Sequence, residues 1–433
     1  MVRTRRSFAL ICLSLLFATH GVHAKTPVLA ETNPEAVGFA SERLKPLHAT
    51  LQAHVDNKQL AGLVTILARH GKIVDRKTYG LQDIAANKPM QKDTIFRIYS
   101  MTKPILGAAM MLLYEESKWK PSDPISRHIP EFANLQVYAG EKDGKPVLEA
   151  PKHAPTMGEL MSHTAGFTYG LFGNSPVDKM YMQDNPLAAG SLKEFIDKLA
   201  KQPLAYQPGE SWVYSVSVDV QGYVVEKLSG KSLPEFLEER IFKPLGMKDT
   251  AFFVPEAKMP RLASVYVPGP QGQGLTALPH DPAVNKLPGL ASGGGGLYST
   301  GDDYLRFAQM LLNGGELDGT RLLAPSTVEL MRANHVPEAL KNGKFGIGYY
   351  RMQPGFGFGY DVGVYEDPAQ VGSTAGKGTY LWDGLAGTWF WIDPTNDVIF
   401  IGMVQRMANA PGMPNLQDTT RALTYRALVD PKK

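Results

Sequence analysis

The sequence lacks the residues on which several common kinds of site are built. Its only cysteine is Cys12, so no disulfide framework or paired-thiol site is available within the chain. It has no His-Glu-x-x-His segment and its ten histidines are scattered, so no metal site is indicated. It also has no Gly-x-Ser-x-Gly, the nucleophile turn of the α/β-hydrolases. We therefore expect no metal or other cofactor, and any covalent catalyst must use another arrangement.

The chain also has little excess charge of either sign. It contains 45 Lys and Arg against 42 Asp and Glu, for a net charge of +3 over 433 residues. This balance does not favour a nucleic acid or an anionic membrane surface as the partner. The chain is long enough for one large or two medium domains. The oligomeric state is left open by the sequence.

The first 24 residues resemble a secretory leader. Three arginines (Arg3, Arg5 and Arg6) precede an apolar run of about ten residues, too short for a transmembrane helix. Ala24 then provides a small residue at which cleavage is expected. Cleavage would remove Cys12 and the three arginines, which brings the formal net charge to zero. We therefore predict an exported protein, periplasmic or secreted, with residues 25–433 as the mature chain.

Strand patterns lie at both ends of the mature chain, and helical patterns dominate its middle. Residues 62–80 read as two strands around a turn at 70–72, and residues 378–404 as aromatic and β-branched strands. Helical periodicity marks 41–57, 300–315, where Thr300 or Asp302 is the expected cap, and about 415–428. The pattern predicts an α/β lobe from about 25–95 and 340–433, interrupted by a mainly helical lobe at about 100–330. A cleft between the lobes is the natural ligand site.

A serine and a lysine stand three residues apart just where a buried helix is expected. Ser100 and Lys103 precede the apolar run 105–113, and on a helix residues three apart share one face. A serine hydroxyl needs a nearby base to become a nucleophile, and a lysine serves when burial lowers its pKa. The alternative is that Ser100 only caps the helix. A second match, Ser117 and Lys120, falls at the polar end of the helix and reads as a solvated turn.

The stretch around Ser100 resembles the active-site motif of the serine β-lactamase and penicillin-binding-protein superfamily, and most closely that of its esterase branch, the family VIII carboxylesterases. Further segments resemble this family in the right order, and the resemblance spans roughly residues 40 to 425. Its implied fold is the α/β β-lactamase/transpeptidase-like fold, an antiparallel sheet flanked by helices plus a mainly helical domain. The segments are 156–170 (His-Thr-x-Gly), 206–230 (second motif), 291–315 (Gly-rich turn and helix) and 378–394 (third motif).

The resemblance assigns roles to individual residues. It implies that Ser100 is the nucleophile and that Lys103 and Tyr214 relay its proton. We expect the Lys103 ammonium to favour the Tyr214 anion and burial to lower the pKa of Lys103. The resemblance also implies that the backbone N–H groups of Ser100 and Leu385 form the oxyanion hole. The substrate-binding residues that it implies are Trp382, Asp383 and Gly384.

Two departures from the family pattern concern substrate binding. Val216 stands where the second motif usually ends in Asn, and Trp382-Asp383-Gly384 stands where β-lactamases have Lys-Thr-Gly. His163 is expected to be structural because this mechanism needs no imidazole, and Gly293 to Gly296 are expected to serve backbone geometry.

The sequence therefore predicts a serine hydrolase that cleaves short-chain carboxylic esters. The alternatives within enzymes are a class C-like β-lactamase or a D-amino-acid peptidase or amide hydrolase. The non-enzymatic alternative is a penicillin-binding receptor that is acylated on Ser100 without turnover. The natural substrate and the acyl-chain preference are left open.

Overall fold

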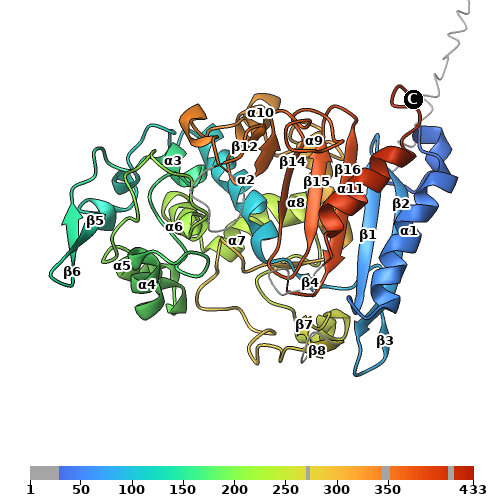
Figure 1. Cartoon of the computed structure of the whole chain (residues 1–433), viewed down its shortest axis with the longest axis horizontal. Helices are drawn as coiled ribbons and strands as arrows, with labels where there is room; N and C mark the ends of the chain where they lie inside the picture. Colours follow the sequence, from blue (N-terminus) through green and yellow to red (C-terminus); the bar gives the residue numbers. More distant parts are fainter. Residues whose placement is uncertain (1–28, 270–273, 344–351, 408–413) are drawn as a thin grey trace, which may run out of the picture.

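The fold is built on one eight-stranded antiparallel sheet, seen in a computed structural model that describes residues 29–269, 274–343, 352–407 and 414–433 (Figure 1). Its strand order is β12-β13-β14-β15-β16-β1-β2-β3. The predicted leader and Cys12 lie outside the described residues. The strands are β1 (Gly62–Arg69), β2 (Lys72–Asp83), β3 (Lys88–Pro89), β12 (Phe356–Phe358), β13 (Gly363–Tyr365), β14 (Tyr380–Asp383), β15 (Trp389–Asp393) and β16 (Val398–Val404).

Strands from the two ends of the chain meet in the middle of this sheet. β1 pairs with β16 in antiparallel fashion, with Ile66 opposite Ile401. β1 and β2 flank the predicted turn, where His70 and Gly71 both have positive φ. The strands predicted at 62–80 and at 378–404 are confirmed. The exact boundaries of the two predicted lobes stay a prediction.

Helices cover both faces of the sheet because neighbouring strand residues point to opposite sides. In β15, the Phe390 ring lies 5.1 Å from that of Tyr304 in α9 (Gly301–Leu312). The next residue, Trp391, lies on the other face, 5.1 Å below the guanidinium of Arg421 in α11 (Leu416–Ala427). α11 also packs against α1 (Ser41–Asp56), beside the same sheet (Figure 1). The predicted helices at 41–57, 300–315 and 415–428 are thus confirmed.

The middle of the chain is mainly helical, with α2 (Thr102–Glu115) at its centre. Every residue of α2 from Thr102 to Leu113 is buried, and the helix packs against α6 and α10. In the described part of the chain, no helix combines the length and apolar character that crossing a bilayer requires. The other helices of this part are α3 (Met157–Met161), α4 (Pro176–Gln183), α5 (Leu192–Leu199), α6 (Ser217–Ser229), α7 (Leu233–Leu237), α8 (Lys243–Leu245) and α10 (Pro325–Arg332).

Short strand pairs within the helical part were not predicted from the sequence. β5 (Val137–Lys142) and β6 (Lys145–Glu149) form a hairpin that projects from the molecule (Figure 1). β7 (Tyr266–Pro268) pairs with β8 (Leu275–Ala277), and β4 (Phe96–Arg97) pairs with β9 (Tyr298–Ser299). Such two- to six-residue strands carry too few alternating positions to be recognised by periodicity.

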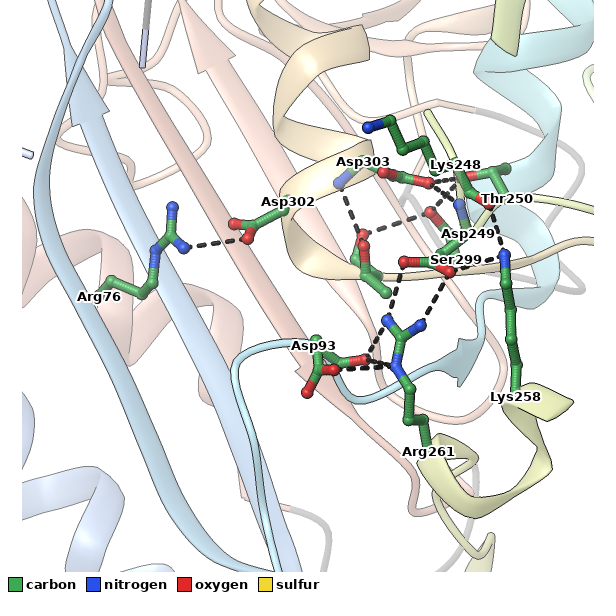
Figure 2. Close-up of polar contacts among 11 residues, drawn as sticks. Arg76, Asp93, Lys248, Asp249, Thr250, Lys258, Arg261, Ser299, Asp302 and Asp303 are labelled. Atoms are coloured by element: carbon green, nitrogen blue, oxygen red, sulfur yellow. Dashed lines mark hydrogen bonds and ion pairs between the residues drawn. The ribbon is translucent and has the colours of Figure 1, made fainter. Parts of the chain in front are cut away.

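A polar network ties the segment 248–262 to the start of α9 (Figure 2). Thr300 caps α9 by accepting from the Asp303 N–H, as predicted. The Asp303 carboxylate accepts from the Asp249 N–H at 2.6 Å and from the Thr250 hydroxyl at 2.9 Å. Arg261 donates two hydrogen bonds to the Asp249 carboxylate, at 2.9 and 2.8 Å. Burial raises the pKa of Asp303 to about 6, above its ordinary 3.8.

The raised pKa of Asp303 makes a prediction about stability and pH. The folded state holds this proton more tightly than the unfolded state, so the contribution is favourable at low pH and is lost as pH rises to about 6. Asp303→Asn removes the titration while keeping an oxygen acceptor. We expect the free energy of unfolding of wild type, relative to the variant, to fall by about 2 kcal/mol between pH 4.5 and 7.5. Urea unfolding at several pH values measures it, and a difference independent of pH would contradict it.

Candidate active site

Ser100 lies in a strained turn that leads directly into α2. The turn is a 3₁₀ helix, Tyr99–Met101, and Tyr99 has a φ of +45°, a left-handed conformation that bulky residues rarely adopt. The Tyr304 hydroxyl donates to the Met101 carbonyl at 3.0 Å, and the Thr102 hydroxyl accepts from the Leu297 N–H at 3.2 Å. These bonds hold the turn from two other segments, so the position of Ser100 is set by its surroundings.

Lys103 is fully buried, and its ammonium is surrounded by oxygen atoms. Its Nζ donates to the Ser100 Oγ at 3.3 Å, to the Tyr169 hydroxyl at 3.0 Å and to the Gly294 carbonyl at 2.6 Å. An ammonium has three N–H groups, so each has an acceptor. Burial lowers the pKa of Lys103 to about 8, although the negative charges of nearby aspartates oppose the shift. A lysine that is so easily deprotonated is suited to accept a serine proton.

Tyr214 completes a cluster with Ser100 and Lys103. It precedes α6, and its hydroxyl accepts from the Trp382 indole N–H at 3.3 Å. The Lys103 ammonium lies over the Tyr214 ring, 4.5 Å from its centre. Burial raises the pKa of Tyr214, while hydrogen bonding with Ser100 and Trp382 opposes the rise. The expected Tyr214 anion is therefore not favoured, because burial raises the pKa of this residue and keeps it a neutral phenol.

The third-motif residues face two different sides of the sheet. Trp382 points to Tyr214, with ring centres 5.4 Å apart, whereas the Asp383 carboxylate accepts from Gln417 of α11 at 2.7 Å. Burial raises the pKa of Asp383. The negative charge of Asp383 is thus directed away from Tyr214. That Asp383 binds substrate stays a prediction.

Gly384 and Leu385 bring the end of β14 against the chain that leads to Ser100. A Cβ on Gly384 would lie 2.4 Å from the Ile98 carbonyl oxygen, so only glycine fits there. Among the hydrogen bonds of the described residues, neither the Ser100 N–H nor the Leu385 N–H is used as a donor. Both are therefore available to a ligand, as the predicted oxyanion hole requires.

Two residues beside Lys103 were not identified from the sequence. The Tyr169 hydroxyl accepts a hydrogen bond from the Lys103 ammonium. Asp219 is connected to that ammonium only through Gly294. The Asp219 carboxylate accepts from the Ser292 hydroxyl at 2.5 Å and from the Gly294 N–H at 3.0 Å. That bond anchors Gly294, the residue whose carbonyl accepts from Lys103. Both residues lie in segments that resemble the family, but no local pattern shows which side chain faces the lysine.

Of the remaining positions singled out in the sequence, His163 lies beside this cluster, whereas Ser117 lies far from it. His163 is buried behind Tyr214, with ring centres 5.2 Å apart, and its Nδ1 bonds with the Ser215 hydroxyl at 3.0 Å. Burial lowers the pKa of His163, so the ring is neutral. Val216 is fully buried, and its side chain has no amide group. Ser117 is exposed just beyond the far end of α2, about 20 Å along the helix from Lys103. Among the described residues, no three His, Cys, Asp or Glu side chains gather into a possible metal site.

Comparison with known proteins agrees with this fold. The family model described as Beta-lactamase matches residues 47–423. Esterase EstB of Burkholderia gladioli is 32% identical over 83% of this chain and 90% of its own length. Lovastatin esterase of Penicillium rubens is 29% identical over 88% of this chain and 98% of its own length. The solved structure of EstCE1, a hydrolase with promiscuous acyltransferase activity, superposes with a TM-score of 0.74. Its sequence identity is 26%, and the match covers 88% of this chain and 98% of EstCE1.

The fold is therefore the β-lactamase/transpeptidase-like fold, and the protein is a serine hydrolase of that superfamily. The chain belongs to the Beta-lactamase family, and esterases are among its relatives, which is consistent with the family VIII esterases.

The charge of Asp219 near Lys103 makes a prediction about the pH dependence of kcat/KM. Asp219 raises the pKa of Lys103, so Asp219→Asn should lower that pKa and enlarge the neutral fraction at neutral pH. The acid limb of kcat/KM for ester hydrolysis should then move to lower pH by about one pH unit. Ser292→Ala, which keeps the carboxylate, is the matched control and should move the limb less. An acid limb at the wild-type position in a folded Asp219→Asn enzyme would contradict this role.

Proposed function

We propose that the protein is a carboxylesterase that hydrolyses short-chain esters through an acyl-enzyme on Ser100. The observation that carries the proposal is the neutral Trp382 at the position of the third-motif lysine, with its indole N–H bonded to Tyr214. A lysine there suits substrates with a carboxylate, whereas an indole offers one neutral N–H and a broad apolar face. The esterase relatives add support for ester substrates.

In the proposed first step, the Ser100 Oγ forms a bond with the ester carbonyl carbon and its proton passes to Lys103. The low pKa of Lys103 and the raised pKa of Tyr214 favour the amine as the acceptor. The Ser100 and Leu385 N–H groups donate to the oxyanion that forms on the carbonyl oxygen. The bond to the alcohol oxygen then breaks, and the alcohol leaves with the proton, which Lys103 returns through the Tyr214 hydroxyl.

In the second step, water replaces the alcohol. A water oxygen attacks the acyl carbon while Lys103 takes one of its protons, and the bond to Ser100 Oγ breaks as the serine regains a proton. The products are the carboxylic acid and free enzyme. Both halves of the proposed reaction thus use Ser100, Lys103, Tyr214 and the two oxyanion-binding N–H groups.

We also infer that the protein is exported. The arginines before a short apolar run and the small residue Ala24 support a leader at residues 1–24. The mature enzyme would then meet its substrate in the periplasm or the medium.

A second candidate function rests on the shared acylation chemistry. The same serine, lysine and tyrosine would serve a β-lactamase or a D-amino-acid peptidase, and slow deacylation would make the protein a penicillin-binding receptor. An acyl-enzyme that lasts for hours, with no multiple turnover of any ester, would favour the receptor.

The nucleophile assignment predicts a specific loss of activity. Ser100→Ala should lower p-nitrophenyl acetate hydrolysis to the uncatalysed rate, and a fluorophosphonate should label Ser100 in wild type. Ser117→Ala is the matched control and should keep full activity, because Ser117 is exposed at the other end of α2. Peptide mapping locates the label. A label on Ser117, or an active Ser100→Ala enzyme, would overturn the assignment.

The neutral side chain of Trp382 predicts the preferred substrate class. We expect kcat/KM for short-chain p-nitrophenyl esters to exceed that for benzylpenicillin by at least about 10²-fold, or about 2.7 kcal/mol in transition-state stabilisation. The reason is that Trp382 cannot neutralise the penicillin carboxylate as a lysine would. Measuring both substrates on one preparation checks the prediction. Comparable values would mean that a cation such as Arg406, whose backbone bonds to Ala386 beyond β14, binds that carboxylate.

A further inference from the structure

A cleft of about 480 Å³ lies beside the turn that carries Ser100. Arg97 and Tyr298, a residue pair of the β4–β9 ladder, line it together with Tyr99. The opposite wall is formed by residues 262–265 and 278–284, most of them apolar. The network of Figure 2 supports this wall, since Arg261 is bonded to Asp249 and Ser299 follows Tyr298 directly. The cleft is therefore bounded by tethered segments.

Arg97 brings a positive charge into this cleft without a protein partner for it. Its guanidinium lies over the Tyr99 ring, 4.4 Å from the centre, and 6.0 Å from the centre of the Tyr298 ring. Within the described ranges, no carboxylate pairs with this guanidinium and no oxygen accepts from it, although its Nε is buried. A half-buried guanidinium with a buried, unused donor is suited to a ligand that supplies an acceptor.

The backbone of Arg97, in contrast, is fully engaged. The Gln405 side chain accepts from the Arg97 N–H at 3.1 Å and donates to the Arg97 carbonyl at 3.0 Å. These two bonds fix the backbone of Arg97, while the Tyr99 ring lies against its guanidinium. A planar guanidinium held in this way can bind a carboxylate through two parallel hydrogen bonds.

The other polar groups of the lining do not neutralise Arg97. Asp281 is the acidic residue of the lining, and it is exposed and accepts from the Ala283 N–H at 2.8 Å. Its carboxylate forms no ion pair with Arg97. The His280 ring bonds with the Ser264 hydroxyl at 3.4 Å. The guanidinium is thus the group best placed to select a ligand by charge.

We propose that this cleft is a specificity site for esters that carry a carboxylate, which pairs with Arg97 while Ser100 attacks the ester carbonyl. The inference rests on the proposed esterase function. Arg97 and Ser100 are three residues apart, so their backbones are separated by at most about 10 Å. An aliphatic chain the length of adipate suits such a separation. The penicillin carboxylate is a different case, because lysine-bearing third motifs bind it on the side of β14, and Trp382 is not part of this cleft.

The test compares esters that differ only in the end group. In the acyl arm, the substrates are p-nitrophenyl hexanoate, mono-p-nitrophenyl adipate and a hexanoate ester with a terminal trimethylammonium group. In the alcohol arm, the butyrate ester of 6-hydroxyhexanoate is compared with hexyl butyrate. The measured quantity is the ratio of kcat/KM for the anionic ester to that for its neutral counterpart.

We expect Arg97→Gln to lower this ratio at least tenfold in one arm, which identifies the part of the ester that enters the cleft. Arg97→Lys, which keeps the charge, should retain part of the preference. Asp281→Asn is the matched control on the neighbouring charge and should leave the ratio unchanged or raise it. Equal ratios in wild type and Arg97→Gln in both arms would overturn the proposal. So would a preference for the trimethylammonium ester that depends on Asp281.

A binding measurement separates failure of this site from failure of the proposed function. If wild type hydrolyses no neutral ester, the esterase proposal fails, and calorimetric titration with adipate then tests the cleft alone. Adipate should bind wild type and Ser100→Ala equally and should bind Arg97→Gln at least tenfold more weakly. Absence of binding to wild type at millimolar adipate would overturn the site.

Discussion

The buried ammonium of Lys103 is the group around which this candidate active site is arranged. A cation without water must find all its hydrogen-bond acceptors in the protein, and Lys103 finds them in Ser100, Tyr169 and the Gly294 carbonyl. These three acceptors come from segments far apart in the chain, so the site forms only when α2, the 156–170 segment and the Gly-rich turn have packed together. The burial of α2 along its whole first three turns keeps water from replacing them.

The hydrogen-bond acceptors of Lys103 are neutral, and this is in keeping with its lowered pKa. A carboxylate in direct contact would stabilise the ammonium and keep the lysine protonated at neutral pH. Asp219 instead bonds to the Gly294 N–H, and its charge raises the pKa of Lys103 without a direct hydrogen bond to the ammonium. Burial therefore prevails, and the pKa of Lys103 falls to about 8. Burial raises the pKa of the neighbouring Tyr214, which therefore stays a neutral phenol. The same loss of solvent thus lowers the pKa of Lys103 and raises that of Tyr214.

The alternation of β14 decides which third-motif side chain reaches this cluster. Trp382 faces Tyr214, and Asp383 faces α11, where Gln417 bonds to it. The Asp383 carboxylate within the motif therefore affects the site only over a longer distance. The close approach at Gly384 then brings the unused Leu385 N–H toward the chain that leads to Ser100. One short strand supplies an indole contact on one face and an anchor to a helix on the other.

The sequence by itself determined the local features of this protein. The Ser100–Lys103 spacing before an apolar helix, the Thr300 cap and the alternating strands at both ends each depend on residues close in the chain, and all were recognisable there. Tertiary structure alone decided the electrostatics. Tyr169, Asp219 and the orientation of Arg97 acquire their roles from neighbours that are tens to hundreds of residues away. The expected Tyr214 anion failed for the same reason, because the pKa of a buried group depends on its complete three-dimensional surroundings and on the exclusion of water, and neither is written in the residues beside it.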